Sequence, residues 1–213
     1  GDFLFIPISQ KIYKINIADG KLDKNFNQGK SYVWSPYTIT APMIYKENLI
    51  SVTVGAVAKV NIHNKINGKL IKTIKLHPKD KNFTGGSPWG GVAMDEEKGI
   101  VYITTGNPQP GTYGVKRPGE NKRSVSIIAF DINKKKIIWD FQEVIHDLWD
   151  YDIPSPPTIH NLRSGDKVYE TIIVVTKVGN TIILDRNNGK NLYDINFEKV
   201  PSSDIIGEKT SPY

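Results

Sequence analysis

The densest group of reactive side chains lies in residues 146–152, which read HDLWDYD. This run holds three carboxylates, one imidazole and two aromatic rings, and the Pro-rich residues 153–157 follow it directly. Carboxylates packed this closely repel one another unless cations, hydrogen bonds or a metal ion neutralise them. The run is therefore a candidate reactive site, although Asp residues also serve in loop caps and hairpin turns.

A second candidate group is the sequence GGSPWGG at residues 85–91, in which Trp89 has glycines on both sides. Glycines leave the indole open to a planar partner, and stacking on an aromatic ligand is worth about 0.5–1.5 kcal/mol beyond the area buried. The alternative interpretation is that Trp89 fills a junction between packed elements of the fold.

Two more polar residues stand at the ends of apolar segments. Asn107 follows the strand-like residues 100–103 and precedes a proline, where Asn commonly serves as a turn residue. Its side-chain oxygen could also bind a hard cation such as Ca²⁺. Lys177 ends the apolar residues 172–176 at a turn, where it is either a solvated lysine or a positive charge placed in a site.

A β-rich framework must position these candidates, because four segments share one plan of an apolar strand, a turn and a second strand. Asn-Gly and Asp-Gly pairs supply the positive φ angles that tight hairpin turns require. The turn residues Gly20, Gly68, Lys135 and Gly189 are separated by 48, 67 and 54 residues. A period of about 50 residues without helical periodicity predicts the blades of a β-propeller.

The longest interval contains residues 78–123, which are rich in Gly and Pro. Loops that exceed the repeat in this way tend to carry function. We expect an all-β fold, a partial propeller of about four blades, in one domain that spans residues 1–213 and is cut at both ends. An open sector exposes unpaired apolar faces, so we expect the piece alone to be inactive and prone to aggregation.

The charge and composition limit which classes of partner we expect. The net charge is +6, but the cations are mainly Lys, with Arg only at positions 117, 123, 163 and 186. Because groove and phosphate readers favour Arg, nucleic acid is not an expected partner. No apolar run of about eighteen residues predicts a membrane-spanning helix. The absence of Cys excludes disulfides and thiolate metal sites from the chain, and it leaves the redox compartment undecided.

Together these motifs resemble the pyrroloquinoline quinone (PQQ)-dependent alcohol and glucose dehydrogenases, which are eight-bladed propellers of the bacterial periplasm. The resemblance covers nearly the whole chain and is densest between residues 85 and 190. GGSPWGG, the strand leading to TGNP, Arg-Pro-Gly at residues 117–119 and HDLWD occur in the family's order and approximate spacing. Residues 129–131 (AFD) followed by Trp139 resemble the motif in which a repeated Trp staples neighbouring blades. Residues 146–157 favour the glucose dehydrogenase branch.

The resemblance implies a role for each candidate. Trp89 would form the floor on which the planar quinone stacks, and Asn107 would give its side-chain oxygen to a Ca²⁺ ion beside the quinone. Asp150 would be the general base that takes the substrate hydroxyl proton and would also contact the metal. Lys177 matches the cation that hydrogen-bonds the quinone oxygens. Of the remaining residues in 146–150, we expect structural roles for His146 and Asp147, and we expect Trp149 to pack against its neighbours.

The resemblance also implies the partners and the compartment. The substrate would be a sugar or an alcohol, and the electron acceptor a quinone or a cytochrome. The expected location is the periplasm, and association with the inner membrane would require segments outside this chain.

One departure from the family concerns the metal. Relatives carry a ligating carboxylate near the position of Val57, whereas residues 52–59 contain no acid. Because Ca²⁺ affinity depends on the number and charge of its ligands, this loss should weaken the site. Glu120 also stands where relatives often have Asp.

Two alternatives to an active enzyme stay open. The chain could belong to a non-catalytic propeller with PQQ-like repeats that binds protein, or to a degenerate family member that has lost its metal. The set of Trp89, Asn107, Asp150 and Lys177 favours the enzyme, provided that these side chains meet in space.

Overall fold

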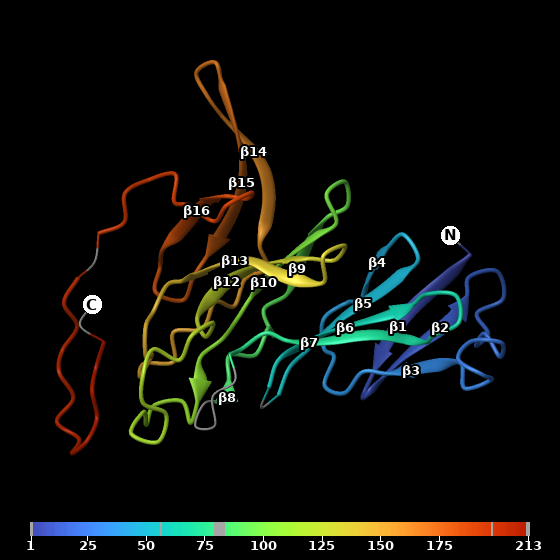
Figure 1. Ribbon diagram of the computed structural model, residues 1–213, viewed down its shortest axis with the longest axis horizontal. Coiled ribbons are helices and arrows are strands. Elements are labelled where there is room, and N and C mark those ends of the chain that lie inside the picture. The colour runs from blue at the N-terminus through green and yellow to red at the C-terminus, as the bar shows by residue number, and fades with distance from the viewer. Residues whose placement is uncertain (1, 56, 79–83, 197, 212–213) are drawn as a thin grey trace. The chain divides into compact units, whose positions relative to one another are not determined.

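The computed structural model describes residues 2–55, 57–78, 84–196 and 198–211, and regular secondary structure in these residues consists of β-strands alone. They contain no helix that could cross a membrane. The chain divides into two compact units, Gly1–Leu76 and His77–Tyr213. Every pair of neighbouring strands within a sheet runs antiparallel (Figure 1).

The first unit contains two sheets. One has the order β1 (Phe3–Ile8), β2 (Lys11–Asn16) and β3 (Tyr32–Trp34). The other has the order β4 (Met43–Tyr45), β5 (Asn48–Thr53), β6 (Lys59–Asn64) and β7 (Leu70–Lys75). Apolar side chains form a buried cluster that includes Ile12, Phe26, Val33 and Leu49. This burial removes apolar surface from water and supplies the main favourable contribution to folding.

The second unit contains two larger sheets and a short ribbon. One sheet has the order β13 (Lys136–Gln142), β12 (Ser126–Asp131), β10 (Ile100–Thr104) and β9 (Val92–Asp95). The next has the order β14 (Thr158–Ser164), β15 (Lys167–Val175) and β16 (Thr181–Asp185). The ribbon pairs β8 (Thr84–Gly85) with β11 (Pro108–Gln109). The central strands β10 and β12 are buried along their whole length, and the residues in the middle of each strand are apolar.

These sheets confirm the predicted fold class, an all-β partial propeller. In two of the four repeated segments, however, the return strand is reduced to a single bridge, Ile15 to Leu22 and Leu184 to Asn191. The hairpin turns themselves are present, with positive φ angles at Gly20, Gly68, Lys135 and Gly189. The expectation of one domain cut at both ends stays a prediction.

Trp139 staples neighbouring sheets as the sequence motif predicts. Its indole Nε1 on β13 donates a hydrogen bond to the backbone oxygen of Arg186, just beyond β16, at 3.1 Å. Its ring lies directly against Gly189, at a position where any side chain would collide with it. On its other side the ring approaches Tyr102, with 5.8 Å between the ring centroids.

An ion network joins the same two sheets. Glu170 on β15 accepts hydrogen bonds from Lys98 Nζ and from Arg186 Nη2, both at 2.7 Å. Lys98 lies in the β9–β10 turn of the neighbouring sheet. The hydrogen bonds from Lys98, Asn187 and Arg186 lower the pKa of Glu170 to about 2.

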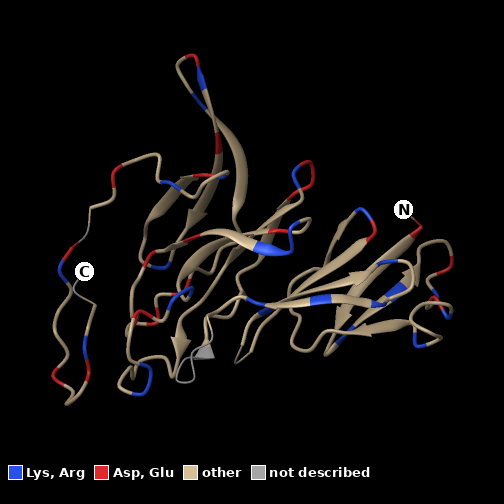
Figure 2. Cartoon of the chain, in the orientation of Figure 1, with Lys and Arg blue, Asp and Glu red and all other residues tan. Residues whose placement is uncertain are grey.

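Basic and acidic residues are interspersed in both units (Figure 2). The expectation that the positive net charge does not serve nucleic acid stays a prediction.

We expect Gly189→Ala to destabilise the protein more than Gly165→Ala. Both glycines have positive φ angles, 72° and 59°, so each substitution should cost about 1–2 kcal/mol in backbone strain. A Cβ at Gly189 would lie 2.7 Å from the Trp139 ring, whereas nothing lies within 4 Å at Gly165. The overpacking should add about 1–3 kcal/mol. Urea unfolding of both variants measures the difference, and equal losses would contradict the staple.

We expect Glu170→Gln to reduce stability at neutral pH and to have little effect near pH 2. The folded-state pKa of about 2 lies below the unfolded value of about 4.3. The ionised carboxylate therefore stabilises the fold above about pH 4, and this contribution is lost as the pH falls toward 2. Urea unfolding at several pH values tests the pattern. Glu47→Gln is the control, because that carboxylate is 59% exposed and should contribute little at any pH.

Candidate functional site

The four side chains singled out in the sequence lie in one hydrogen-bonded cluster. The Asp150 carboxylate accepts a bond from Asn107 Nδ2 at 2.6 Å and another from Lys177 Nζ at 2.8 Å. Trp89 Nε1 donates to Asp152 Oδ1 at 3.3 Å, and the same oxygen accepts the backbone N–H of Asn107 at 2.7 Å. The four side chains therefore meet in space, as the enzyme hypothesis requires. Their roles toward a ligand stay predictions.

The topology explains why residues so distant in sequence meet. Trp89 precedes β9, Asn107 follows β10, Asp150 lies between β13 and β14, and Lys177 lies between β15 and β16. In a chain that reverses direction at every strand, every second connection lies at the same end of the sheets. All four residues occupy this set of connections, which defines the site end of the second unit.

Three residues of the cluster are exposed to solvent. The Trp89 residue is 44% exposed, and the side chains of Lys177 and Asp150 are 44% and 49% exposed. A ring that filled a junction would be buried, so the structure favours an accessible indole over that alternative. Asp152, by contrast, is buried.

The glycines around Trp89 serve close packing. A Cβ at Gly90 would lie 2.6 Å from the backbone oxygen of Pro154, and one at Gly91 would lie 2.9 Å from Pro156. A Cβ at Gly106 would likewise lie 2.8 Å from the Trp89 indole nitrogen. These glycines therefore let the Trp89 segment lie against the Pro-rich segment that follows Asp150.

Asp147 shapes the loop that presents Asp150. Its fully buried carboxylate accepts the backbone N–H groups of Trp149 and Tyr151, each at 2.9 Å. Burial raises the pKa of Asp147, and these two hydrogen bonds oppose the shift. The loop passes through positive φ at His146 (50°) and Asp150 (63°), a conformation that needs support from its surroundings. The contacts of Asp147 agree with the predicted structural role.

His146 also makes structural contacts. Its Nδ1 lies 2.7 Å from the backbone oxygen of Gly119, and its Nε2 lies 3.1 Å from Glu208 Oε1. Trp149 packs as predicted, with its ring stacked on Tyr151 at a centroid distance of 5.9 Å.

Arg117 is a supporting residue whose importance the sequence did not reveal. It is completely buried and donates to three backbone oxygens, those of Pro110, Gly111 and Asp147. Its Nη1 also donates to Asn121 Oδ1 at 2.6 Å. One guanidinium thus ties the long 105–125 connection to the loop that carries Asp150. The Arg-Pro-Gly motif was its only signal in the sequence.

Asp152 is the second residue that sequence reasoning missed. Its carboxylate orients both Trp89 and Asn107, and its other oxygen lies 3.9 Å from Lys177 Nζ. The signal was the third acid of HDLWDYD, two positions after Asp150. On Lys177, the hydrogen bond to Asp150 raises the pKa of the ammonium, with the nearby Asp charges acting in the same direction. Lys177 is therefore a cation at neutral pH.

The described residues contain no group of three or more His, Asp or Glu side chains arranged to hold a metal ion. The amide of Asn107 and the carboxylate of Asp150 are adjacent, but the amide turns Nδ2 toward Asp150 and its Oδ1 accepts from Gln109 Nε2 at 3.3 Å. The two residues would offer a pair of oxygens to Ca²⁺ only after the Asn107 amide flips. Residues 52–59, which contain no acid, belong to the first unit, and Ala56 lies outside the described residues.

Comparisons with known proteins bear on the family and the fold. The PQQ family model, described as the β-propeller domain of glucose/ethanol/alcohol dehydrogenases, matches residues 63–213. Quinoprotein glucose dehydrogenase A of Acinetobacter calcoaceticus is 29% identical over 240 residues, covering 97% of this chain and 30% of that protein. The chain therefore spans less than a third of this relative.

Two solved structures bear on the fold. A europium-containing methanol dehydrogenase superposes with a TM-score of 0.76 at 19% identity, covering 91% of this chain and 39% of its own. BamB from Moraxella catarrhalis gives a TM-score of 0.52 at 11% identity, covering 92% of this chain and 49% of its own. Both are similar in fold, and the dehydrogenase is the closer of these two.

We expect Arg117→Met to destabilise the protein by roughly 3 kcal/mol or more, because buried oxygens lose their donors and each unsatisfied group costs about 1–3 kcal/mol. Arg163→Met is the matched control, since Arg163 is exposed on β14 and a surface change usually stays within about 0.5 kcal/mol. Urea unfolding measures both. A loss at position 117 no larger than at position 163 would show that the guanidinium does not hold the loop.

Proposed function

The chain belongs to the PQQ β-propeller family of glucose, ethanol and alcohol dehydrogenases, and we propose that the whole protein oxidises a sugar or alcohol hydroxyl with PQQ. The observation that carries this proposal is the contact of Asp150 with Asn107 and Lys177, beside the exposed indole of Trp89. An open aromatic ring and a cation suit a planar quinone with polar oxygens. A carboxylate held by an amide and a cation suits a substrate hydroxyl.

Asp150 is the proposed general base. Its half-exposed carboxylate can reach a substrate hydroxyl, and the two donors that hold it fix its orientation. Taking the O–H proton in the transition state contributes typically about 10²–10⁴-fold to the rate. The buried Asp147 beneath the loop keeps that carboxylate in place.

Trp89 and Lys177 fit the cofactor. The bond to Asp152 fixes the edge of the indole and leaves the ring accessible for stacking. The Lys177 ammonium can donate hydrogen bonds to quinone oxygens. When bound, PQQ supplies the redox chemistry by accepting the hydride equivalents, and the protein orients and polarises it.

Asn107 and Asp150 are the proposed ligands of a Ca²⁺ ion. Carboxylate and amide oxygens fit the chemistry of this ion once the Asn107 amide flips to turn Oδ1 toward Asp150, but Ca²⁺ takes about 6–8 oxygen ligands. The remaining ligands must come from the cofactor, from water or from other residues. A bound cation would act as a Lewis acid on the quinone. The missing acid in residues 52–59 predicts weaker metal binding than in relatives that have it.

We further propose a periplasmic location and a quinone or cytochrome as electron acceptor. The family description supports a sugar or alcohol substrate, and the relative named above is a glucose dehydrogenase. Membrane association, where it occurs, would depend on segments other than those described.

A protein-binding scaffold is the second candidate, favoured only by the fold-level similarity to BamB. A scaffold has no need for the hydrogen-bonded set around Asp150, so the site favours the enzyme. A degenerate enzyme without metal is the third candidate, and the missing acid in residues 52–59 motivates it.

The central experiment reconstitutes the full-length protein with PQQ and Ca²⁺ and measures dye reduction with aldoses and alcohols. We expect turnover that requires the cofactor. No cofactor-dependent turnover with any substrate would favour the scaffold or the degenerate enzyme. Binding of PQQ, measured with and without Ca²⁺, separates these two losses. A scaffold should not bind PQQ under either condition.

We expect Asp150→Asn to lower kcat by about 10²–10⁴-fold, the usual contribution of a placed base. Binding of PQQ should be largely retained, because Asn preserves the shape of the side chain. Quenching of tryptophan fluorescence measures this binding. Unchanged turnover would rule out Asp150 as the base.

A further inference from the structure

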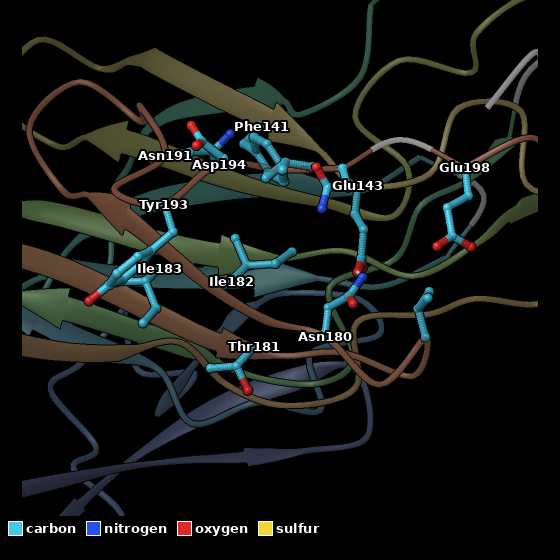
Figure 3. Close-up of a pocket in the computed structure, with 13 residues that line it drawn as sticks. Phe141, Glu143, Asn180, Thr181, Ile182, Ile183, Asn191, Tyr193, Asp194 and Glu198 are labelled. Carbon is cyan, nitrogen blue, oxygen red and sulfur yellow. Dashed lines mark hydrogen bonds between the residues drawn. The ribbon is translucent and has the colours of Figure 1, made fainter.

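The turn that carries Lys177 is held by a carboxylate from the neighbouring sheet. Glu143 follows β13 directly, and its Oε1 accepts hydrogen bonds from Thr176 Oγ1 at 2.8 Å and from Asn180 Nδ2 at 2.9 Å. Thr176 and Asn180 are the first and last residues of the β15–β16 turn. One oxygen atom therefore ties both ends of this turn, and Figure 3 shows Glu143 beside Asn180.

The turn has its own hydrogen bonds, but these do not fix it to the neighbouring sheet. Thr176 N donates to Asn180 O at 3.0 Å, and Gly179 N donates to Thr176 O at 3.1 Å. Across the boundary, the Lys177 backbone N–H makes only a long contact of 3.4 Å with Asp152 O. Glu143 is anchored on its own side, since its N–H donates to Val125 O at 2.9 Å.

Glu143 occupies an environment that is unfavourable for a carboxylate. Burial raises its pKa, and the hydrogen bonds from Asn180 and Thr176 only partly oppose this shift. Its second oxygen, Oε2, is buried and has no hydrogen-bond partner among the described residues. Phe141 and Ile182 lie close by, where they line a cavity of about 620 Å³ together with Glu143 (Figure 3). An acid at this position costs stability, which calls for a reason beyond turn formation.

We propose that Glu143 is a positioning residue, which holds residues 176–180 so that Lys177 Nζ meets Asp150. Lysine has a long flexible stem and a charge that bonds in many directions, so its location depends on its backbone. Glu143 fixes that backbone relative to the sheet from which the Asp150 loop departs. Its consequence for catalysis rests on the proposed function, whereas its structural part does not.

A purely structural role predicts a different outcome. If Glu143 only closed the turn, its loss would lower stability and leave the pairing of Lys177 with Asp150 intact. If it positions Lys177, its loss frees the ammonium even at temperatures where the protein is fully folded. The exposed Lys177 amine makes this distinction measurable.

The test compares Glu143→Ala with Glu143→Gln in the full-length protein. Gln keeps an oxygen that can accept from both Thr176 and Asn180, whereas Ala removes it. Glu170→Ala is the control, since Glu170 also joins the two sheets but contacts none of the site residues. Thermal unfolding of each variant fixes a common temperature at which all are folded.

The first measurement is trace acetylation of lysines at fixed pH, read by mass spectrometry and normalised to Lys134. We expect Lys177 to react about 2–5-fold faster in Glu143→Ala, the factor that corresponds to losing an exposed ion pair. Glu143→Gln and Glu170→Ala should react like the unaltered protein. This measurement needs no cofactor.

The second measurement is kcat and KM with PQQ and Ca²⁺. A misplaced group can lower the rate on the order of 10²-fold, so Glu143→Ala should lose kcat by up to that factor. The kcat of Glu143→Gln should stay within about threefold of the unaltered protein. The substrate KM should change little in both variants. If Glu143→Ala does not fold, Thr176→Val removes one of the two donors and should show the same effects at smaller size.

Unchanged Lys177 reactivity in Glu143→Ala would overturn the proposal, as would a loss in Glu143→Gln as large as in Glu143→Ala. Absence of PQQ-dependent turnover in the unaltered protein would instead overturn the proposed function. In that case the acetylation result still decides whether Glu143 positions Lys177.

Discussion

The carboxylate of Asp150 is held between an amide and an ammonium that come from different sheets of the second unit. Both hydrogen bonds can form only if the two sheets and the loop between them are held in fixed positions relative to one another. Trp139 and Glu170 join the sheets, while Arg117 ties the loop to the long connection beside it. The site is therefore a product of packing across the whole unit.

The acid-rich run also shows how three neighbouring carboxylates avoid mutual repulsion. Each has different partners: Asp147 binds backbone N–H groups, Asp150 binds an ammonium and an amide, and Asp152 binds an indole and a backbone N–H. Hydrogen bonds to the charged form of Asp147 partly offset the cost of its burial. The outer acid remains half exposed and available for chemistry.

The repeated turns predicted the blades, and the ordered motifs predicted which side chains meet. Arg117, Glu143 and Glu208 could not be found in this way, because each has a partner that lies 30 to 94 residues away in the sequence, and such contacts depend on how sheets and connections pack. Asp152 was visible in the motif, but nothing in the sequence distinguished its inward carboxylate from that of its neighbour. The turns before Leu22 and Asn191 form as predicted, but the return strands are reduced to single bridges, a length that the turn signal alone does not predict.

The alternation of connections separates two kinds of requirement within one unit. The connections at the site end carry Trp89, Asn107, Asp150 and Lys177, whereas the opposite end carries the turns that contain Lys98, Gly165 and Gly189. Sequence changes at the site end can alter the ligands that fit there without disturbing the staple between sheets. Changes at the opposite end alter how firmly the sheets are joined, and they affect the chemistry only through that cohesion. Such a fold can diversify in substrate while its architecture stays the same.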